Sequence, residues 1–193
     1  MEKIKCVIDR YFDFMEEIGS NSFIEELIPE ELINSEKEPK YERTKFWKPI
    51  ISTITNNDIE GLEEYYGCKL PNSYKFFLRY RHFLELNLGQ YSISFFKSLP
   101  KSFVQNTIEE IEDNYENLIK RNFIPFAHMS DYGVLCFKVV NSDVSNDYEI
   151  VSFDHEDDFE NPEQYSNNFE SMFIEFENHL NEWIKNRREK NTT

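Results

Sequence analysis

Glycine and cysteine are both scarce in this chain. Five glycines in 193 residues leave little material for a glycine-rich loop that cradles phosphates, and no P-loop or dinucleotide-binding motif occurs. The three cysteines, Cys6, Cys68 and Cys136, are far apart and odd in number. This argues against a disulfide framework and indicates buried thiols in a reducing compartment.

Long apolar runs are also missing. No run approaches the ~20 residues that a membrane-spanning helix needs. The first 20 residues contain Asp and Glu throughout, which is unlike a signal peptide. We therefore expect no membrane association and a cytoplasmic location.

Positive charge is in short supply as well. Lys and Arg total 21 against 37 Asp and Glu, giving a formal net charge of -16. Because nucleic-acid binding depends on basic groups that neutralise phosphates, this balance argues against DNA or RNA as a partner. It argues equally against anionic membrane surfaces. Two interpretations stay open: a basic protein partner, or solubility alone.

Aromatic residues are abundant, with 18 Phe and 11 Tyr to fill a core. Apolar residues at spacings of three and four predict an N-terminal amphipathic helix that ends near Gly19. We expect residues 1–45 to form this helix and a charged connection, residues 46–185 to form the main domain, and residues 186–193 to form a polar tail. The predicted helix has these apolar positions: Ile4, Val7, Ile8, Tyr11, Phe12, Met15 and Ile18.

The main domain mixes helical and strand patterns. Asp58 is the expected N-cap of a helix that Gly67 ends, and Pro71 starts the next helix. Strands are predicted in "YSISFF" and at 123–127, 133–140 and 149–155, with a helix over 107–119 and a long closing helix from Phe169. Short loops between successive strands predict an α+β fold. It has a mainly antiparallel sheet of about four to six strands with helices packed on one face, plus the N-terminal helix.

No catalytic constellation emerges. The acidic segment from Phe153 to Glu160 offers oxygen ligands for Ca²⁺ or Mg²⁺, but it lacks the Asp spacing and the Gly turn of a Ca²⁺ loop. A solvated acidic loop is the favoured interpretation. Cys136 lies in an apolar strand, and no base is in evidence for Cys68. We expect no enzyme activity, no cofactor and no metal site.

One charge feature stands out. From Asn141 through Trp183 the chain has thirteen acidic residues and no Lys or Arg. Soluble surfaces usually mix charges of both signs, so a stretch of one sign favours a basic partner. Aromatic anchors often accompany such charges at interfaces. We therefore predict these partner-binding residues: Asp143, Asp147, Phe153, Asp154, Glu156, Asp157, Asp158, Phe159 and Glu160.

The stretch "IEGLEEYYGCKLPNSYKFFL" has strict apolar positions and resembles the opening motif of the SUKH superfamily. That family includes the yeast Smi/Knr cell-wall regulator and many bacterial immunity proteins. "FIPFAHMSDYGVLCFKVV", "EIVSFDHE" and the closing helix from Asn168 are similar to later family segments in the same order. The likeness covers roughly residues 46–184. The motif positions are Ile59, Leu62, Glu63, Gly67, Leu70, Pro71, Tyr74, Phe77 and Leu78.

The resemblance implies a scaffold rather than a catalytic centre. For the bacterial members it implies an immunity protein that neutralises a cognate toxin, often a nuclease or another nucleic-acid-directed enzyme. The expected partner is then a basic toxin that meets the acidic segment. The alternative is a regulatory protein-interaction scaffold of the Smi/Knr type. Glu63 either bonds to the backbone near the turn or faces water, and the oligomeric state is left open.

Overall fold

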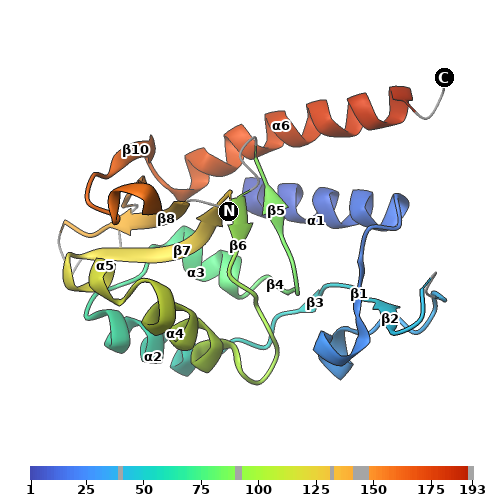
Figure 1. Cartoon of the computed structure of the whole chain (residues 1–193), viewed down its shortest axis with the longest axis horizontal. Coiled ribbons are helices and arrows are strands. Elements are labelled where there is room, and N and C mark those ends of the chain that lie inside the picture. Colours follow the sequence, from blue (N-terminus) through green and yellow to red (C-terminus); the bar gives the residue numbers. More distant parts are fainter. Residues whose placement is uncertain (39–40, 90–92, 131–132, 141–147, 191–193) are drawn as a thin grey trace.

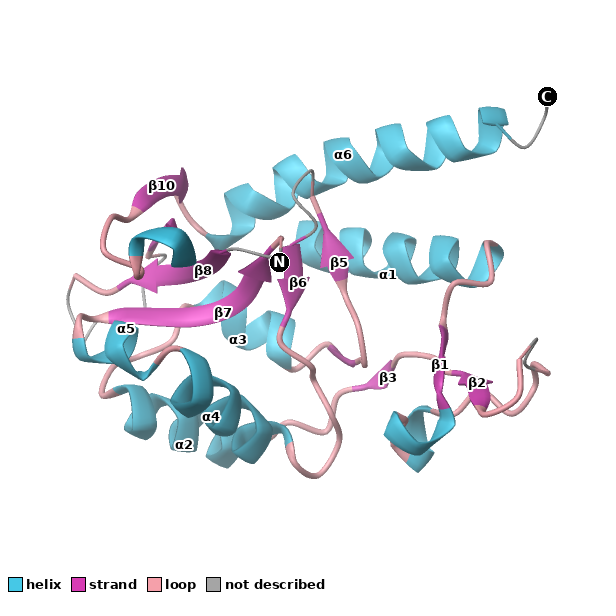
Figure 2. Cartoon of the chain, viewed as in Figure 1, coloured by secondary structure: helices cyan, strands magenta, loops and turns pink. Residues whose placement is uncertain are grey.

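The computed structural model describes residues 1–38, 41–89, 93–130, 133–140 and 148–190, and its helices and strands form an α+β fold (Figures 1 and 2). The α-helices are α1 Glu2–Glu17, α2 Asn56–Tyr66, α3 Asn72–Leu78, α4 Phe103–Asn114, α5 Glu116–Lys120 and α6 Phe169–Lys190. The strands are β1 Ser22–Ile24, β2 Thr44–Phe46, β3 Ile50–Ile51, β4 Arg81–His82, β5 Asn87–Leu88, β6 Ile93–Phe95, β7 Phe123–Met129, β8 Gly133–Lys138, β9 Glu149–Asp154 and β10 Glu163–Ser166. Short 3₁₀ turns, labelled η1 to η3, cover Glu25–Leu27, Glu30–Leu32 and His155–Asp157.

The main sheet has six antiparallel strands in the order β10-β9-β8-β7-β6-β5. This confirms the predicted fold class and strand number. Three predicted strands match β7, β8 and β9 closely, while Tyr91 and Ser92 of the predicted "YSISFF" strand lie outside the described residues. Strand β10 was not predicted, because "EQYS" is polar and pairs only at the edge of the sheet.

The central strands are buried on both faces. On one face Phe137 of β8 stacks on Phe126 at 4.4 Å between ring centroids and meets Tyr74 of α3 at 5.0 Å and Phe169 of α6 at 5.7 Å. Side chains alternate along a strand, so Cys136 points to the other face, and it is fully buried there. Helices α3 and α6 therefore cover one face, while α5 packs beside β7.

The motif resembling the SUKH opening forms the α2–α3 unit. Helix α2 begins at Thr55, not at the expected Asp58: the Thr55 side chain accepts the Asp58 N–H, and the Asp58 carboxylate accepts the Thr55 N–H. This reciprocal capping box uses both residues at the helix start. Gly67 ends α2 with φ +67°, a conformation that costs glycine little, and Pro71 precedes α3 as predicted.

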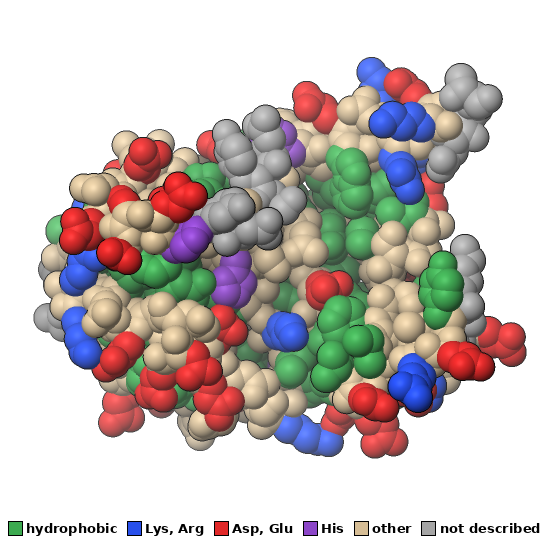
Figure 3. All heavy atoms as spheres, viewed as in Figure 1, with side chains coloured by type: hydrophobic (Ala, Val, Ile, Leu, Met, Phe, Trp, Pro, Cys, Tyr) green, Lys and Arg blue, Asp and Glu red, His purple; other side chains and the backbone are tan. Residues whose placement is uncertain are grey.

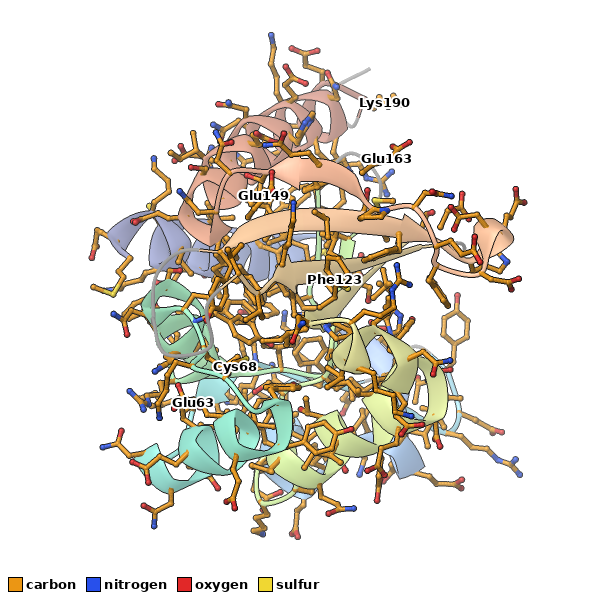
Figure 4. All side chains as sticks on the ribbon, turned by 90° about the vertical axis from the view of Figure 1, so that its left-hand side faces the viewer. Glu63, Cys68, Phe123, Glu149, Glu163 and Lys190 are labelled. Carbon is orange, nitrogen blue, oxygen red and sulfur yellow. The ribbon has the colours of Figure 1, made fainter. Side chains whose placement is uncertain are left out.

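Glu63 does not face water. Its carboxylate is buried and accepts the Leu70 N–H at 3.0 Å, with the Nζ atoms of Lys75 and Lys69 at 2.5 and 2.7 Å. Figure 4 shows Glu63 and Cys68 close together where α2 turns toward α3. The carboxylate thus joins the turn between α2 and α3 to Lys75 of α3. This matches the first of its two expected roles, bonding to the backbone near the turn.

Helix α1 lies beside α6, and the two run in the same direction (Figure 1). Lys3 Nζ pairs with Glu177 at 2.7 Å, and Phe14 packs edge-on against Trp183 at 4.9 Å. The apolar side chains of α1 belong to the same core as the sheet. Helix α6 continues to Lys190, so the polar residues from position 186 to 190 are its last turns.

The charged connection after α1 contains a small antiparallel pair that was not predicted. Ser22 of β1 pairs with Phe46 of β2, and Trp47 packs against Phe12 at 5.8 Å. The cysteine prediction was partly wrong: all three thiols are free, and Cys68 and Cys136 are buried, but Cys6 is exposed on α1.

Replacing Glu63 by Gln should lower the free energy of unfolding by about 2–3 kcal/mol, because Gln keeps an acceptor for Leu70 but leaves Lys75 without its counter-charge. Burial raises the pKa of Glu63, but the bonds from Lys69, Lys75 and Leu70 outweigh it and hold the pKa below 4.5. The stabilisation is therefore present above pH 4.5 and lost as pH falls through the lower folded pKa.

Urea unfolding of the wild type and E63Q from pH 7 down to pH 3 measures both effects. The matched control is E64Q, which neutralises the exposed neighbour on the same helix. Equal losses of stability in E63Q and E64Q, or a gap that stays constant with pH, would contradict the assigned role.

Candidate protein-interaction surface

The acidic segment after β9 is a built loop, not an unstructured run of charge. Asp154 Oδ1 accepts the Glu156 N–H at 2.8 Å, and the Asp157 carboxylate accepts the N–H groups of Glu160 and Asn161, each at 3.2 Å. The Asn161 side chain donates to the same carboxylate at 3.0 Å and leads the interactions that lower the pKa of Asp157. Two of the predicted acids therefore shape the loop.

Arg121 clamps this loop from beneath. Its guanidinium donates to the carbonyl oxygens of Phe159 at 2.5 Å and Glu160 at 2.9 Å. The same group lies over the Phe153 ring at 5.3 Å and the Phe123 ring at 5.7 Å. Arg121 follows α5 in the chain, so a cation 38 residues away from Phe159 fixes the loop against the sheet.

The clamped loop holds an aromatic side chain in an unusual backbone conformation. Asp158 and Phe159 have φ values of 55° and 60°, in the left-handed region that bulky residues rarely adopt. The Phe159 ring packs edge-on against Tyr115 at 5.8 Å. The two carbonyl bonds from Arg121 and this ring contact stabilise a conformation that the local sequence alone disfavours.

The predicted partner-binding residues fall into four groups. Asp154, Glu156, Asp158 and Glu160 are exposed, and Asp157 and Phe159 are half-buried. Phe153 was wrongly placed at the surface: it is only 1% exposed and packs on Phe123, so it supports the loop from the core. Asp143 and Asp147 lie outside the described residues.

The single-sign charge run is partly neutralised in three dimensions. Glu149 pairs with Lys138 at 2.9 Å, and Glu177 pairs with Lys3. By contrast, Glu156, Asp158 and Glu160 form no ion pair with any lysine or arginine in the described part of the chain. These three loop carboxylates therefore keep uncompensated charge.

A second acidic element joins the loop. A hollow of about 480 Å³ separates the loop from the α4–α5 junction, and Asp113, Tyr115, Asp158 and Phe159 are among the residues that line it. Figure 3 shows acidic side chains gathered over α4–α5 at the lower left and over the loop at the upper left. The α4–α5 acids on this side are Glu109, Glu110, Glu112, Asp113 and Glu116.

Sequence reasoning missed this second element, although the signal was present. In "IEEIEDNYE" the apolar Ile108, Ile111 and Tyr115 point inward at helical spacing, so the acids between them share the outer face. The charge run after residue 141 is visible along the sequence alone. Two charged stretches that lie over 30 residues apart become neighbours only once the sheet places α5 beside β7.

A histidine and a tyrosine lie between the two acidic elements. Tyr115 Oη and His128 Nδ1 are 2.8 Å apart, and His128 Nε2 is 3.4 Å from a Glu110 carboxylate oxygen. Burial lowers the pKa of His128 in spite of Glu110, and burial also raises the pKa of Tyr115 to about 12. Both side chains are therefore uncharged at neutral pH.

Burial raises the pKa of Cys68 to about 11 and holds the pKa of Cys136 well above its ordinary value, which keeps both thiols protonated and poorly nucleophilic. In the residues that the structure covers, no group of three or more His, Cys, Asp or Glu is placed to hold a metal ion. No helix within those residues has the length and apolar character to cross a bilayer.

Replacing Arg121 by Lys should loosen the loop, because an ammonium group lacks the planar fork that serves two carbonyls. We expect the backbone amides of Phe159 and Glu160 to exchange with deuterium about tenfold faster, while β8 amides stay protected. The control K120Q removes the adjacent cation, whose one ion pair within the described residues is with Glu116. Unchanged protection in R121K would show that Arg121 does not hold the loop.

The chain was compared with known proteins and with protein-family models. No curated protein matches the chain. A sequence model of the SMI1/KNR4 family (SUKH-1) matches residues 53–175, a span that runs from the α2 cap to the first turns of α6. The matched span contains the α2–α3 motif, the acidic loop and α4–α5, and it covers well over half of the sequence, so the chain belongs to the SMI1/KNR4 family (SUKH-1).

Proposed function

We propose that this protein is an immunity protein that binds and neutralises a cognate toxin in the cytoplasm of the cell that makes the toxin. The toxin is a basic protein, a nuclease or another enzyme directed at nucleic acid. The observation that carries the proposal is the acidic loop from Asp154 to Glu160. Three of its exposed carboxylates pair with no lysine or arginine in the described residues, and Arg121 holds the loop to the sheet.

Charge complementarity supports this type of partner. A nuclease holds its substrate phosphates with Lys and Arg, so its cleft is positive. The loop and α4–α5 present carboxylates on one side of the molecule, and they compete with nucleic acid for the same basic groups. A surface of this sign repels nucleic acid itself, and complementary fields raise the association rate of a basic protein.

The rigidity of the loop supports tight binding. An ordered loop loses less conformational entropy on association than a mobile one. Its backbone is fixed by Asp154, Asp157 and Arg121 before any partner arrives. Half-buried Phe159 adds apolar area at the centre of the charged surface.

A regulatory scaffold of the Smi/Knr type is the second candidate, and one observation favours it. Ile24, Leu27 and Ile51 are large apolar side chains that are 49%, 56% and 74% exposed, and they precede the family span. Exposed apolar residues outside the common domain suit an additional protein contact.

The test begins with capture of the tagged protein and its partners from its own host. We expect one basic partner that is toxic when expressed alone and harmless when co-expressed with this protein. Many partners without toxicity would favour the scaffold, and capture of neither kind would count against both functions.

Charge neutralisation then tests the surface. The double variant E156Q/E160Q should slow association with the captured toxin about tenfold at low salt, and the difference should shrink as salt is raised. The matched control E26Q/E42Q removes the same charge from the opposite end of the molecule, around η1 and β2 (Figure 1). Association that is insensitive both to salt and to E156Q/E160Q would contradict the electrostatic mechanism.

A further inference from the structure

A cleft of about 420 Å³ opens beside the acidic loop, between α4 and the strands β6 and β7. Its volume lies in the range of sites that bind small ligands or single side chains. None of the loop residues 154–160 lines the cleft, so the cleft and the loop are separate sites on the same side of the molecule.

The inner wall of the cleft is apolar and aromatic. Phe96 and Leu84 are almost fully buried at this wall, and Leu99 is half-buried. The Phe95 ring points instead into the core on the other face of the sheet, where it packs on Phe77 and Phe173. The Phe96 ring meets the His128 ring edge-on at 5.0 Å. An occupant therefore needs an apolar portion, which excludes a hydrated metal ion or a bare ammonium group as the best fit.

The rim of the cleft carries excess negative charge. Glu85, Glu109, Glu110 and Asp113 line it, against the single ammonium group of Lys97. His128 contributes no compensating charge, because burial lowers its pKa. The occupant is consequently a cation.

The carboxylates are only partly engaged within the protein. Glu110 contacts Asn114 Nδ2 at 3.1 Å and His128 Nε2 at 3.4 Å, both with the same oxygen atom. The Asp113 carboxylate makes no hydrogen bond or ion pair with any residue that the structure describes, and Asp113 lines both this cleft and the hollow next to the loop. The second Glu110 oxygen and the Asp113 carboxylate are available to a ligand.

We propose that the cleft binds an arginine side chain of the partner protein; this rests on the proposed function, in that the partner is a basic protein. The aliphatic stem of arginine covers the apolar wall. The guanidinium group is planar, weakly hydrated and able to stack on aromatic rings, and its fork of donors matches carboxylates. A lysine ammonium group can pair with the carboxylates of the rim, but it does not stack on the aromatic wall.

A small probe tests the cleft without the partner. N-acetyl-arginine amide is titrated into the ¹⁵N-labelled full chain, with N-acetyl-lysine amide and the uncharged isostere N-acetyl-citrulline amide in parallel. We expect arginine to bind about fivefold more tightly than citrulline and more tightly than lysine, with the largest shifts at Glu110, Asp113 and the His128 ring. Equal affinities for arginine and citrulline, equal affinities for arginine and lysine, or equal shifts in the 154–160 loop would overturn the proposal.

Two variants sharpen the assignment. The double variant E110Q/D113N should abolish the preference for arginine over citrulline, while E26Q/E42Q keeps it. Unfolding midpoints in urea identify any loss caused by misfolding, because Asn and Gln at these exposed and half-buried sites should leave stability unchanged. A preference that survives in folded E110Q/D113N would overturn the proposal.

The captured partner supplies the final arm, which separates the two proposals. In the complex, each arginine of the partner is replaced by lysine in turn. One of these substitutions should weaken binding to the wild-type chain about tenfold and should have little effect on binding to E110Q/D113N. Failure of every arginine in an otherwise tight complex would overturn the cleft assignment and leave the proposed function standing. If the arginine probe binds as expected but no toxin partner is found, the cleft assignment stands and the proposed function is overturned.

Discussion

Packing of aromatic rings against both faces of the central strands is the constraint on which the rest of the structure depends. Phe137 joins β8 to Phe126 of β7, Tyr74 of α3 and Phe169 of α6. These rings come from positions as far apart as 74 and 169, so they close the fold rather than one element of it. Such rings bury large areas, and their edge-to-face and offset contacts add to the stabilisation.

Arg121 links the aromatic core to the surface loop. Its guanidinium lies over the Phe123 and Phe153 rings and donates to the two loop carbonyls. A single side chain therefore couples the buried face of β9 to the backbone of the acidic loop. Phe153, expected at the surface as an anchor, contributes to the loop through this contact.

Local patterns predicted the elements that depend on local spacing. The α1 stripe, the Gly67–Pro71 turn and strands β7 to β9 follow from periodicity and turn residues, and the structure confirms them. Asp58 shows the limit of this approach, because Thr55 and Asp58 are both good caps and only the geometry reveals that they act together. Strand β10 and the β1–β2 pair are too short and too polar to produce a periodic signal.

The candidate surface depended on contacts that local patterns do not contain. The exposed acids of the loop were predicted, but Arg121 and Asp113 were not, because their partners and neighbours lie on other elements. The pairing of Glu149 with Lys138 likewise appears only when β8 and β9 are aligned in register. Counting charge along the sequence therefore included acids that are neutralised in the structure and left out acids on α4–α5 that lie near the loop.

The placement of charge explains how a domain with net charge -16 keeps one surface distinct. Some acids are neutralised within the fold, as Glu63 is by two lysines and Glu177 is by Lys3. On the loop and on α4, acids such as Glu156, Asp158 and Asp113 pair with no lysine or arginine in the described residues, and Phe159 packs against Tyr115 between these two elements. Self-repulsion of these acids is a cost that folding alone does not require. A basic partner relieves that repulsion on binding, so part of the affinity arises from charge that the free protein already holds close together.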